Sequence, residues 1–520
     1  MTPLDMTALD TALDALPQAY PGPGGVAGVV KDGKVIATRA WGYRNLDTRA
    51  PMTTGTRLPI CSISKQFTCG VLLDQLGAPE ALDGKLGAFL PAFTGEMPKA
   101  RDLCNNQSGL RDYWALTVTH GALAEQTFAR GDALPMIARM KTGHFAPGTR
   151  YSYCNCNFRI ISELIEQETG RPLDELYREV IWDPAGMETT VLTADTRHPE
   201  DGVVAYEGAP GVGYFPADNG IYWIGDAGIS ASLDDMLAYE AWIDATRDDP
   251  DSLYRRLSER QAFRDGAPAW YGFGLVHETI GGRHVTGHGG ALRGIRANRL
   301  HVADERLSVM VHFNHEGDAH AAAQGLIKAA LGVETPAGRQ VDAGWKGQWL
   351  CPETGLLTRV DPALDGALLK FTTGAAKLVP GEDGTLSSPG MRAALDGETL
   401  SLTVVQDNIA VEMPPLPVVT AADGSEIAGR YHSVELEADM VIEARDGGVY
   451  GVFEGLLGQG RMERIHPAGP DVWALVTRRS MDAPAPGEWT IRVTRGADGA
   501  VSGLVLGCWL ARGIEYAKAG

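Results

Sequence analysis

The stretch ICSISKQFTCGVLL, from Ile60 to Leu73, places two serines and a lysine at the front of an apolar run. Apolar residues from Phe67 onward recur at helical spacing, and Gly77 is a residue type that commonly ends a helix. The pattern therefore predicts a helix over 60–77. A lysine this close to the buried face of a helix has two interpretations: it is either a solvated side chain near an ordinary helix cap, or the proton acceptor of a serine nucleophile.

Ser62 and Lys65 have the spacing that the second interpretation needs, because residues three apart lie on one face of a helix. A serine hydroxyl is a weak nucleophile until a base removes its proton, and lysine can be that base when burial or a neighbouring cation lowers its pKa. A serine at a helix N-terminus also offers its own backbone N–H to a developing oxyanion. A Ser-x-x-Lys tetrad is common by chance, so alone it favours the helix-cap interpretation.

Two further segments contain residue types that suit acyl transfer. In YSYCNCNFR, Tyr153 can shuttle a proton and Asn155 can hydrogen-bond a substrate carbonyl, if both lie in a loop between helical segments. In TGHGGALRG, His288-Gly289-Gly290 follows a predicted strand, where glycines let a ligand approach the backbone and Ala291 can supply a second oxyanion N–H. Each segment also has a structural explanation: a packed tyrosine with a turn asparagine, and a turn with a surface histidine.

Composition restricts the partners of the chain. It has 520 residues, a formal net charge of −20 and a pI of about 5.0, which disfavours nucleic acid and anionic membrane surfaces and suits a neutral or cationic ligand. No secretory signal pattern and no run of about 18 apolar residues is present. The seven cysteines are an odd number and are typical of reduced thiols rather than of a disulfide framework. We therefore expect a cytoplasmic protein.

The chain divides into an N-terminal part of mixed helix and strand and a C-terminal part rich in strands. Val26–Trp41 alternates apolar and polar residues around Asp32-Gly33, which predicts a hairpin. Further helices are predicted over 157–169, 233–246 and 319–331, and short strands over 271–276, 284–286 and 307–314. After Leu331 a linker-like segment precedes β-rich runs separated by Asp-Gly turns, and a second break falls near residue 418. We expect domains at 1–333, 334–418 and 419–520.

No motif predicts a metal or a cofactor, so we expect neither. HEGDAH at 315–320 lacks the i, i+4 histidine pair of a zinc protease. Cys154-Asn-Cys156 has no second cysteine pair with which to form a zinc site, and we interpret its cysteines as buried thiols. Neither a phosphate-binding loop nor a dinucleotide fingerprint occurs in the chain.

Together and in this order, Ser62-Ile-Ser-Lys65, Tyr153-Cys-Asn155 and His288-Gly-Gly290 resemble the three motifs of the penicillin-recognizing serine hydrolases. That family includes D-alanyl-D-alanine peptidases, class C β-lactamases and related esterases. The resemblance covers about residues 20–330, and CNNQSGLRDY (104–113) and GDAGISASLDDM (225–236) agree with it. It implies an α+β fold: an antiparallel sheet flanked by helices, with the nucleophile at the N-terminus of a buried helix. The chain departs from the family by having histidine at 288, where most members have lysine, and by lacking an export signal.

The long C-terminal part resembles one branch of this family, the D-stereospecific aminopeptidases. In that branch two antiparallel β-barrels follow the catalytic domain, and a loop of the last barrel enters the cleft; the molecules form homodimers. The matching loop here is 478–488, RRSMDAPAPGE, in which Pro484 and Pro486 would stiffen the backbone and Asp482 would face a substrate α-ammonium. From the residues alone, a Pro-rich surface turn with a solvated aspartate is the simpler interpretation, and the resemblance reverses that preference.

The resemblance implies an enzyme that removes N-terminal D-residues (D-alanine, with glycine and D-serine as further candidates) from small peptides, amides and esters with a free amino terminus. The resemblance assigns Ser62 as the nucleophile, and Lys65 and Tyr153 to proton transfer. It assigns the N–H groups of Ser62 and Ala291 to binding the oxyanion. Asn155 and His288 would orient the substrate or tune the pKa of the lysine, and Asp482, Gly289 and Gly290 would bind the substrate. The alternatives are a β-lactamase-like esterase or D,D-carboxypeptidase with the same nucleophile, and a penicillin-binding sensor without hydrolytic activity.

Overall fold

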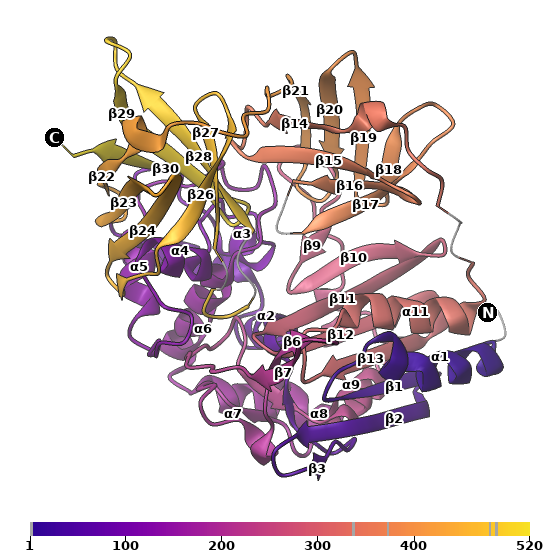
Figure 1. The fold of residues 1–520 in the computed structure, drawn as a ribbon. Coiled ribbons are helices and arrows are strands. Elements are labelled where there is room, and N and C mark those ends of the chain that lie inside the picture. The colour runs from indigo at the N-terminus through magenta and orange to yellow at the C-terminus, as the bar shows by residue number, and fades with distance from the viewer. Residues whose placement is uncertain (1–3, 335–337, 372–373, 478–479, 484–486, 520) are drawn as a thin grey trace.

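The computed structural model describes residues 4–334, 338–371, 374–477, 480–483 and 487–519. An eight-stranded antiparallel sheet organises the first part, in the order β3-β2-β1-β13-β12-β11-β10-β9. Its strands are β1 Gly24–Lys31, β2 Lys34–Asn45, β3 Ala50–Pro51, β9 Tyr271–Gly272, β10 Leu275–Ile280, β11 Arg283–Leu292, β12 Ile295–Val302 and β13 Leu307–Phe313. Strands from both ends of this part therefore lie side by side, with a helical insertion between them in sequence (Figure 1).

The predicted hairpin is confirmed. β1 and β2 pair antiparallel, and Asp32 and Gly33 take φ values of 51° and 72°, as a two-residue turn between twisted strands requires. By contrast, β11 continues to Leu292 instead of ending at residue 286, and it pairs with β12, which sequence analysis did not predict. The sequence of β12, IRANRLHV, shows little apolar alternation because several of its polar side chains are buried.

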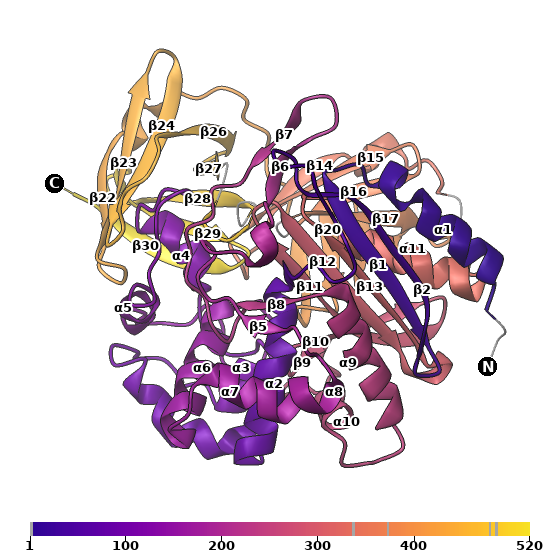
Figure 2. The same cartoon turned by 90° about the horizontal axis from the view of Figure 1, so that it is seen from below.

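Helices cover both faces of the sheet (Figure 2). On one face α1 Met6–Ala19 and α11 Ala319–Leu331 pack together over the strands, and α11 has the predicted bounds. The other face carries the larger helical cluster, whose interior is the main hydrophobic core. That cluster contains α2 Ser64–Leu76, α3 Ala100–Cys104, α4 Tyr113–Thr119, α5 Ala133–Ala138, α6 Asn155–Thr169, α7 Leu173–Tyr177, α8 Asp183–Ala185, α9 Leu233–Ala245 and α10 Leu253–Leu257.

Short strands complete this part of the molecule. A three-stranded sheet, β4-β8-β5, consists of β4 Leu58–Pro59, β5 Val191–Leu192 and β8 Ile229–Ala231. A separate hairpin pairs β6 Tyr206–Ala209 with β7 Gly213–Pro216. Because β4 leads directly into the stretch that begins at Ile60, its pairing with β8 fixes where that stretch enters the helical cluster.

A buried ion pair joins the sheet to the helical cluster. The guanidinium of Arg299, on β12, donates hydrogen bonds from Nε and Nη2 to the two carboxylate oxygens of Glu240, on α9, at 2.5 and 2.9 Å. Both side chains are almost completely buried. The same guanidinium also donates to the Gln66 side chain of α2 at 3.2 Å. The pair therefore positions α2 as well as α9 against the sheet.

The C-terminal part forms two antiparallel barrels, as the resemblance implied. The first is an eight-stranded meander of β14 Gly347–Leu350, β15 Leu357–Ala363, β16 Gly366–Lys370, β17 Ala375–Pro380, β18 Leu386–Ser388, β19 Met391–Asp396, β20 Thr399–Val404 and β21 Ile409–Met413. The second has nine strands, β22 Gly429–Ser433, β23 Ala438–Arg445, β24 Gly448–Gly455, β25 Gly458–Gln459, β26 Glu463–Gly469, β27 Val472–Val476, β28 Glu488–Arg495, β29 Val501–Cys508 and β30 Ala511–Lys518, and pairing of β23 with β24 closes it. The connection between β27 and β28 contains the predicted cleft loop.

Two features of the described residues bear on partners. None of their helices is both long enough and apolar enough to cross a membrane. Within the same residues, no group of three or more His, Cys, Asp or Glu side chains is arranged to hold a metal ion. All seven cysteines are buried and none is in a disulfide.

We expect Arg299→Met to lower the free energy of unfolding by about 3–5 kcal/mol, because it leaves the Glu240 carboxylate buried without its partner. Urea denaturation measures the change. The matched control is Arg39→Met, which removes the more exposed ion pairs with Asp10 and Asp14 and should cost less than about 1 kcal/mol. Equal losses in the two variants would contradict the importance of the buried pair.

Candidate active site

Ser62 lies in a single 3₁₀ turn, Cys61–Ile63, that leads directly into α2. The apolar spacing predicts one helix over 60–77, whereas the α-helix begins two residues after the serine and ends before Gly77. Cys61 takes a φ of 52°, a left-handed backbone that is costly for a residue with a side chain. α2 is buried nearly all round, so the side chain of Lys65 lies in the interior.

Lys65 is completely buried and points at the serine. Its Nζ lies 3.0 Å from Ser62 Oγ, and it donates to Asn155 Oδ1 at 2.7 Å and to the backbone oxygen of Asp226 at 2.6 Å. Burial lowers the pKa of Lys65 to about 8, although the nearby charges of Asp226 and Asp112 oppose that shift. A substantial fraction of the amine is therefore neutral near physiological pH, as a proton acceptor requires.

Asn155 is held from behind by a buried carboxylate. Its backbone N–H and its Nδ2 both donate to Asp112 Oδ2, at 2.5 and 2.8 Å, which leaves Oδ1 free to accept from Lys65. Burial raises the pKa of Asp112 to about 6, and the hydrogen bonds from Asn155 work against that rise. Asn155 is the first residue of α6 and not part of the loop that its sequence context predicts. At this helix start its backbone N–H and its side-chain amide both point at Asp112.

Tyr153 packs against Lys65. Lys65 Nζ is 4.9 Å from the centre of its ring. Burial raises the pKa of Tyr153 well above its usual value, and a hydrogen bond with Ser62 offsets only part of this rise. The phenol therefore keeps its proton at neutral pH, whereas the lysine beside it loses its proton much more readily.

β11 passes close to the serine. A Cβ added at Gly290 would lie 2.3 Å from the backbone oxygen of Ile60 and 3.2 Å from Cys61 Cβ, so only glycine allows this approach. Ala291 follows on the strand and lines the same cleft as Ser62. The structure thus brings together the two residues whose N–H groups sequence analysis expected at the oxyanion.

His288 lies on β11 as a neutral imidazole. Its Nδ1 donates to the backbone oxygen of Gly289 at 2.5 Å, and its Nε2 lies 3.0 Å from the hydroxyl of Tyr271. Because a carbonyl oxygen can only accept, Nδ1 carries the proton and Nε2 accepts from the phenol. Burial, with the charge of Lys65, lowers the pKa of His288 to about 3. His288 is therefore a polar and uncharged group in the site.

Asp482 reaches the cleft from the last barrel. Its backbone oxygen accepts from the Arg293 N–H at 2.9 Å, and its Oδ1 accepts from Ser480 Oγ at 3.0 Å. Burial raises the pKa of Asp482 to about 7, and the charges of Asp112 and Asp226 raise it further. The surroundings therefore disfavour the negative charge of this carboxylate. The predicted stiffening residues Pro484 and Pro486 lie outside the described residues.

All the predicted site residues that face solvent meet in one cleft of about 660 Å³, a volume typical of small-ligand sites. Its wall includes Ser62, Tyr153, Asn155, His288, Gly289, Gly290, Ala291 and Asp482, together with the aromatic rings of Trp114, Tyr151, Trp270 and Tyr271. Ser480, Asp482 and Ala483, which lie between β27 and β28 of the last barrel (Figure 1), line the same cleft. The cleft is therefore built by the catalytic part and the last barrel together.

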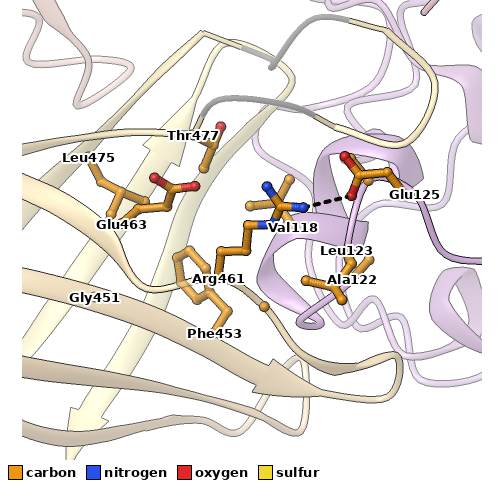
Figure 3. Close-up of a pocket in the computed structure, with 12 residues that line it drawn as sticks. Val118, Ala122, Leu123, Glu125, Gly451, Phe453, Arg461, Glu463, Leu475 and Thr477 are labelled. Carbon is orange, nitrogen blue, oxygen red and sulfur yellow. Dashed lines mark hydrogen bonds and ion pairs between the residues drawn. The ribbon is translucent and has the colours of Figure 1, made fainter. Parts of the chain in front are cut away.

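A second, smaller pocket lies at the base of the last barrel (Figure 3). Residues 122–125 form one side and strands of the last barrel form the other, and an ion pair of 3.0 Å joins Glu125 to Arg461. Its volume is about 50 Å³, and its lining contains none of the predicted site residues. We interpret it as part of the contact through which the barrel docks, not as a substrate site.

Two carboxylates of the site, Asp112 and Asp226, were not predicted, although both lie in segments that agree with the family resemblance. Asp112 is the second-to-last residue of CNNQSGLRDY, and Asp226 is the second residue of GDAGISASLDDM. Asp226 Oδ2 accepts from the Tyr113 hydroxyl at 2.7 Å and from Trp114 Nε1 at 3.3 Å. A buried aspartate is an unusual core residue, but its burial could not be read from a chain with 66 acidic residues.

Comparison with known proteins agrees with this geometry. The family described as Beta-lactamase matches residues 9–333, and the family described as D-aminopeptidase, domain B matches residues 339–517. A D-aminopeptidase from Cereibacter sphaeroides is 66% identical over 515 residues, with 99% of each chain covered. The chain belongs to the D-aminopeptidase family. A D-aminopeptidase from Brucella anthropi is 52% identical over 523 residues, covering 100% of this chain and 99% of the relative.

Solved structures show the same fold at low sequence identity. A D-stereospecific amidohydrolase from Streptomyces has a TM-score of 0.51 and 24% identity, covering 64% of this chain and all of the other. A D-amino acid amidase from Ochrobactrum anthropi has a TM-score of 0.52 and 18% identity, with coverages of 62% and 98%. The penicillin-binding protein homologue from Pyrococcus abyssi has a TM-score of 0.52 and 17% identity, with coverages of 92% and 99%.

We expect a fluorophosphonate probe to label Ser62 at a rate that increases with pH up to about 8 and then levels off. The neutral form of Lys65, which accepts the serine proton, becomes dominant above its pKa of about 8. Below that value the rate should fall roughly tenfold per pH unit. Intact-protein mass spectrometry against time measures the labelling. Ser62→Ala should abolish it, and a labelling rate that is flat from pH 6 to 9 would contradict the role of the lysine.

Proposed function

We propose that the chain is an aminopeptidase that hydrolyses N-terminal D-residues, D-alanine above all and with glycine and D-serine as further candidates, from small peptides, amides and esters. The observation that carries the proposal is the presence of Asp482 in the same cleft as the hydrogen-bonded Ser62–Lys65 pair. A nucleophile with a buried amine beside it can acylate many carbonyl compounds. A carboxylate in the same cleft restricts the choice to substrates that carry a cation.

The proposed reaction is acyl transfer through the serine. Ser62 Oγ attacks the carbonyl carbon of the N-terminal residue while Lys65 Nζ, 3.0 Å away, takes the hydroxyl proton. The N–H groups of Ser62 and Ala291 stabilise the oxyanion. Lys65, assisted by Tyr153, then passes the proton to the leaving amine, and water hydrolyses the acyl-enzyme. The pKa of Tyr153, which is raised well above its usual value, supports the lysine as the first acceptor.

Asn155 and His288 act on the groups around this reaction. Asn155 Oδ1 accepts from Lys65 at 2.7 Å, which orients the lone pair of the amine when it is neutral. His288 remains uncharged because of its burial, so it adds no positive charge that would depress the pKa of Lys65 further. In the proposal Gly289 and Gly290 leave room for substrate along β11, and His288 orients it.

The charge of the cleft supports recognition of a free amino group. Asp112 and Asp226 are buried carboxyl groups whose pKa values the charge of Lys65 lowers, and Asp482 is a third, partly buried carboxyl group in the same cleft. A substrate α-ammonium would form a charge-assisted hydrogen bond with Asp482. A substrate with a blocked amine would leave that carboxylate buried and uncompensated.

The assignment extends to the organisation of the protein. We propose a catalytic domain at 1–333, a first barrel at 334–418 and a second barrel at 419–520 that supplies the specificity loop 478–488. The break at 418 falls between β21 and β22. A homodimer working in the cytoplasm is part of the same proposal, and the seven buried free cysteines suit a reducing compartment.

We expect the purified protein to release p-nitroaniline from D-alanyl p-nitroanilide but not from the L-alanyl or N-acetyl-D-alanyl compounds, because it recognises both the configuration and the free amine. Absorbance at 405 nm follows the release. The Ser62→Ala variant is the control and should show no turnover. Hydrolysis of the acetylated compound, or equal rates on the two enantiomers, would favour the esterase or carboxypeptidase alternative. Stable acylation by a β-lactam without turnover would favour the sensor.

We expect Asp482→Asn to raise KM for D-alanyl p-nitroanilide by about 10- to 100-fold, since it removes a charged partner worth roughly 1.5–3 kcal/mol. The rate on the N-acetylated compound should rise instead, because no buried charge then opposes it. Steady-state kinetics on the two substrates measure both effects. Asp365→Asn, at an exposed aspartate of the first barrel, is the control, and an equal change on both substrates would contradict amine recognition.

A further inference from the structure

The cleft continues past the catalytic groups into a lobe at the start of α11. This α11 lobe is lined by Gly289, Asn298, Gly317, Asp318 and Ala319, and it is continuous with the space beside Ser62. The proposed reaction uses none of these residues except Gly289. β12, which carries Asn298, packs directly against α11, so this lobe lies on the α11 face of the sheet, and the cleft reaches it from the Ser62 side past Gly289.

The order of groups along β11 determines which part of a substrate reaches this lobe. Arg293, just after the strand, holds Asp482 by a backbone hydrogen bond of 2.9 Å. Ala291 precedes it by two residues and Gly289 by four, so Gly289 lies about 13 Å from Arg293 at roughly 3.3 Å per residue. A substrate whose amine faces Asp482 and whose carbonyl lies beside Ala291 therefore extends its leaving group toward Gly289.

Asn298 is placed to meet that leaving group. It pairs with Gly289 across the β11–β12 ladder, and its side chain is 3% exposed. Within the described residues its Oδ1 has no hydrogen-bond partner, although a buried amide oxygen normally has one. A Cβ added at Gly289 would lie 3.3 Å from Asn298 Nδ2. The glycine therefore leaves the amide open to the cleft.

We propose that Asn298 binds the backbone amide that follows the scissile bond, which makes peptides of at least two residues the preferred substrates over simple amides. A primary amide both donates and accepts, so it can pair with either the N–H or the carbonyl of a second peptide group. A ligand that fills the lobe also gives the unpaired oxygen its partner. This inference rests on the proposed function, because it needs a D-residue held between Asp482 and Ser62.

The test compares two substrates that differ only in the leaving group. D-Alaninamide releases ammonia and lacks a second peptide group, whereas D-alanyl-glycinamide releases glycinamide and has one. We expect Asn298→Ala to lower the ratio of kcat/KM for D-alanyl-glycinamide to that for D-alaninamide by at least tenfold, mainly through KM for the longer substrate. Chromatography of the released D-alanine measures both reactions.

Two further variants guard against a general structural effect. Gly289→Ala should lower the same ratio, because its Cβ presses on the Asn298 amide. Asn298→Asp keeps the size of the side chain but loses the donor, and should also lower the ratio. If the wild type hydrolyses both substrates and every variant keeps the wild-type ratio, the subsite is excluded while the proposed function stands. If the wild type hydrolyses neither substrate, both proposals fail.

Discussion

The burial of one amine is the constraint on which the rest of the site depends. Lys65 donates to three neutral oxygens, those of Ser62, Asn155 and the backbone of Asp226. A direct contact with a carboxylate would have raised its pKa and disabled it as a base. The carboxylate of Asp112 instead acts through Asn155, and that of Asp226 turns away to Tyr113 and Trp114. The two carboxylates are therefore close enough to stabilise the protonated form of Lys65 in the protein interior. Neither contacts the amine directly, so they do not prevent it from losing its proton.

This arrangement requires segments that are far apart in sequence to dock together. The three acceptors belong to the turn before α2, to α6 and to the segment before β8. The last barrel contributes to the same structure from outside, because Arg111, next to Asp112, is buried against it. The Arg111 guanidinium donates to Glu435 and to the backbone oxygen of Arg512, each at 2.8 Å. The barrel therefore stabilises the catalytic part as well as supplying the loop.

The local features of the fold could be predicted from sequence, and the features that depend on buried polar pairs could not. The hairpin around Asp32-Gly33 and the helix over 319–331 follow from turn chemistry and apolar spacing, and both are present. β12 was missed because Asn298, Arg299 and His301 hide its pattern, and each is buried. Likewise the motif order placed Ser62, Lys65 and Asn155 together, but Asp112 and Asp226 act through burial, which a single sequence does not reveal.

The separate origin of Asp482 has an electrostatic consequence for the base. The negative charge of Asp482 raises the pKa of Lys65, although less than the charges of Asp226 and Asp112 do. Burial has the largest effect and lowers that pKa. Recognition of an amine by a carboxylate therefore opposes activation of the lysine in the free enzyme. In the proposed complex a substrate ammonium neutralises Asp482, so the pKa of Lys65 falls again. A substrate with the correct charge thus increases the neutral fraction of the amine that accepts the serine proton, and specificity for a free amino end becomes coupled to the rate of acylation.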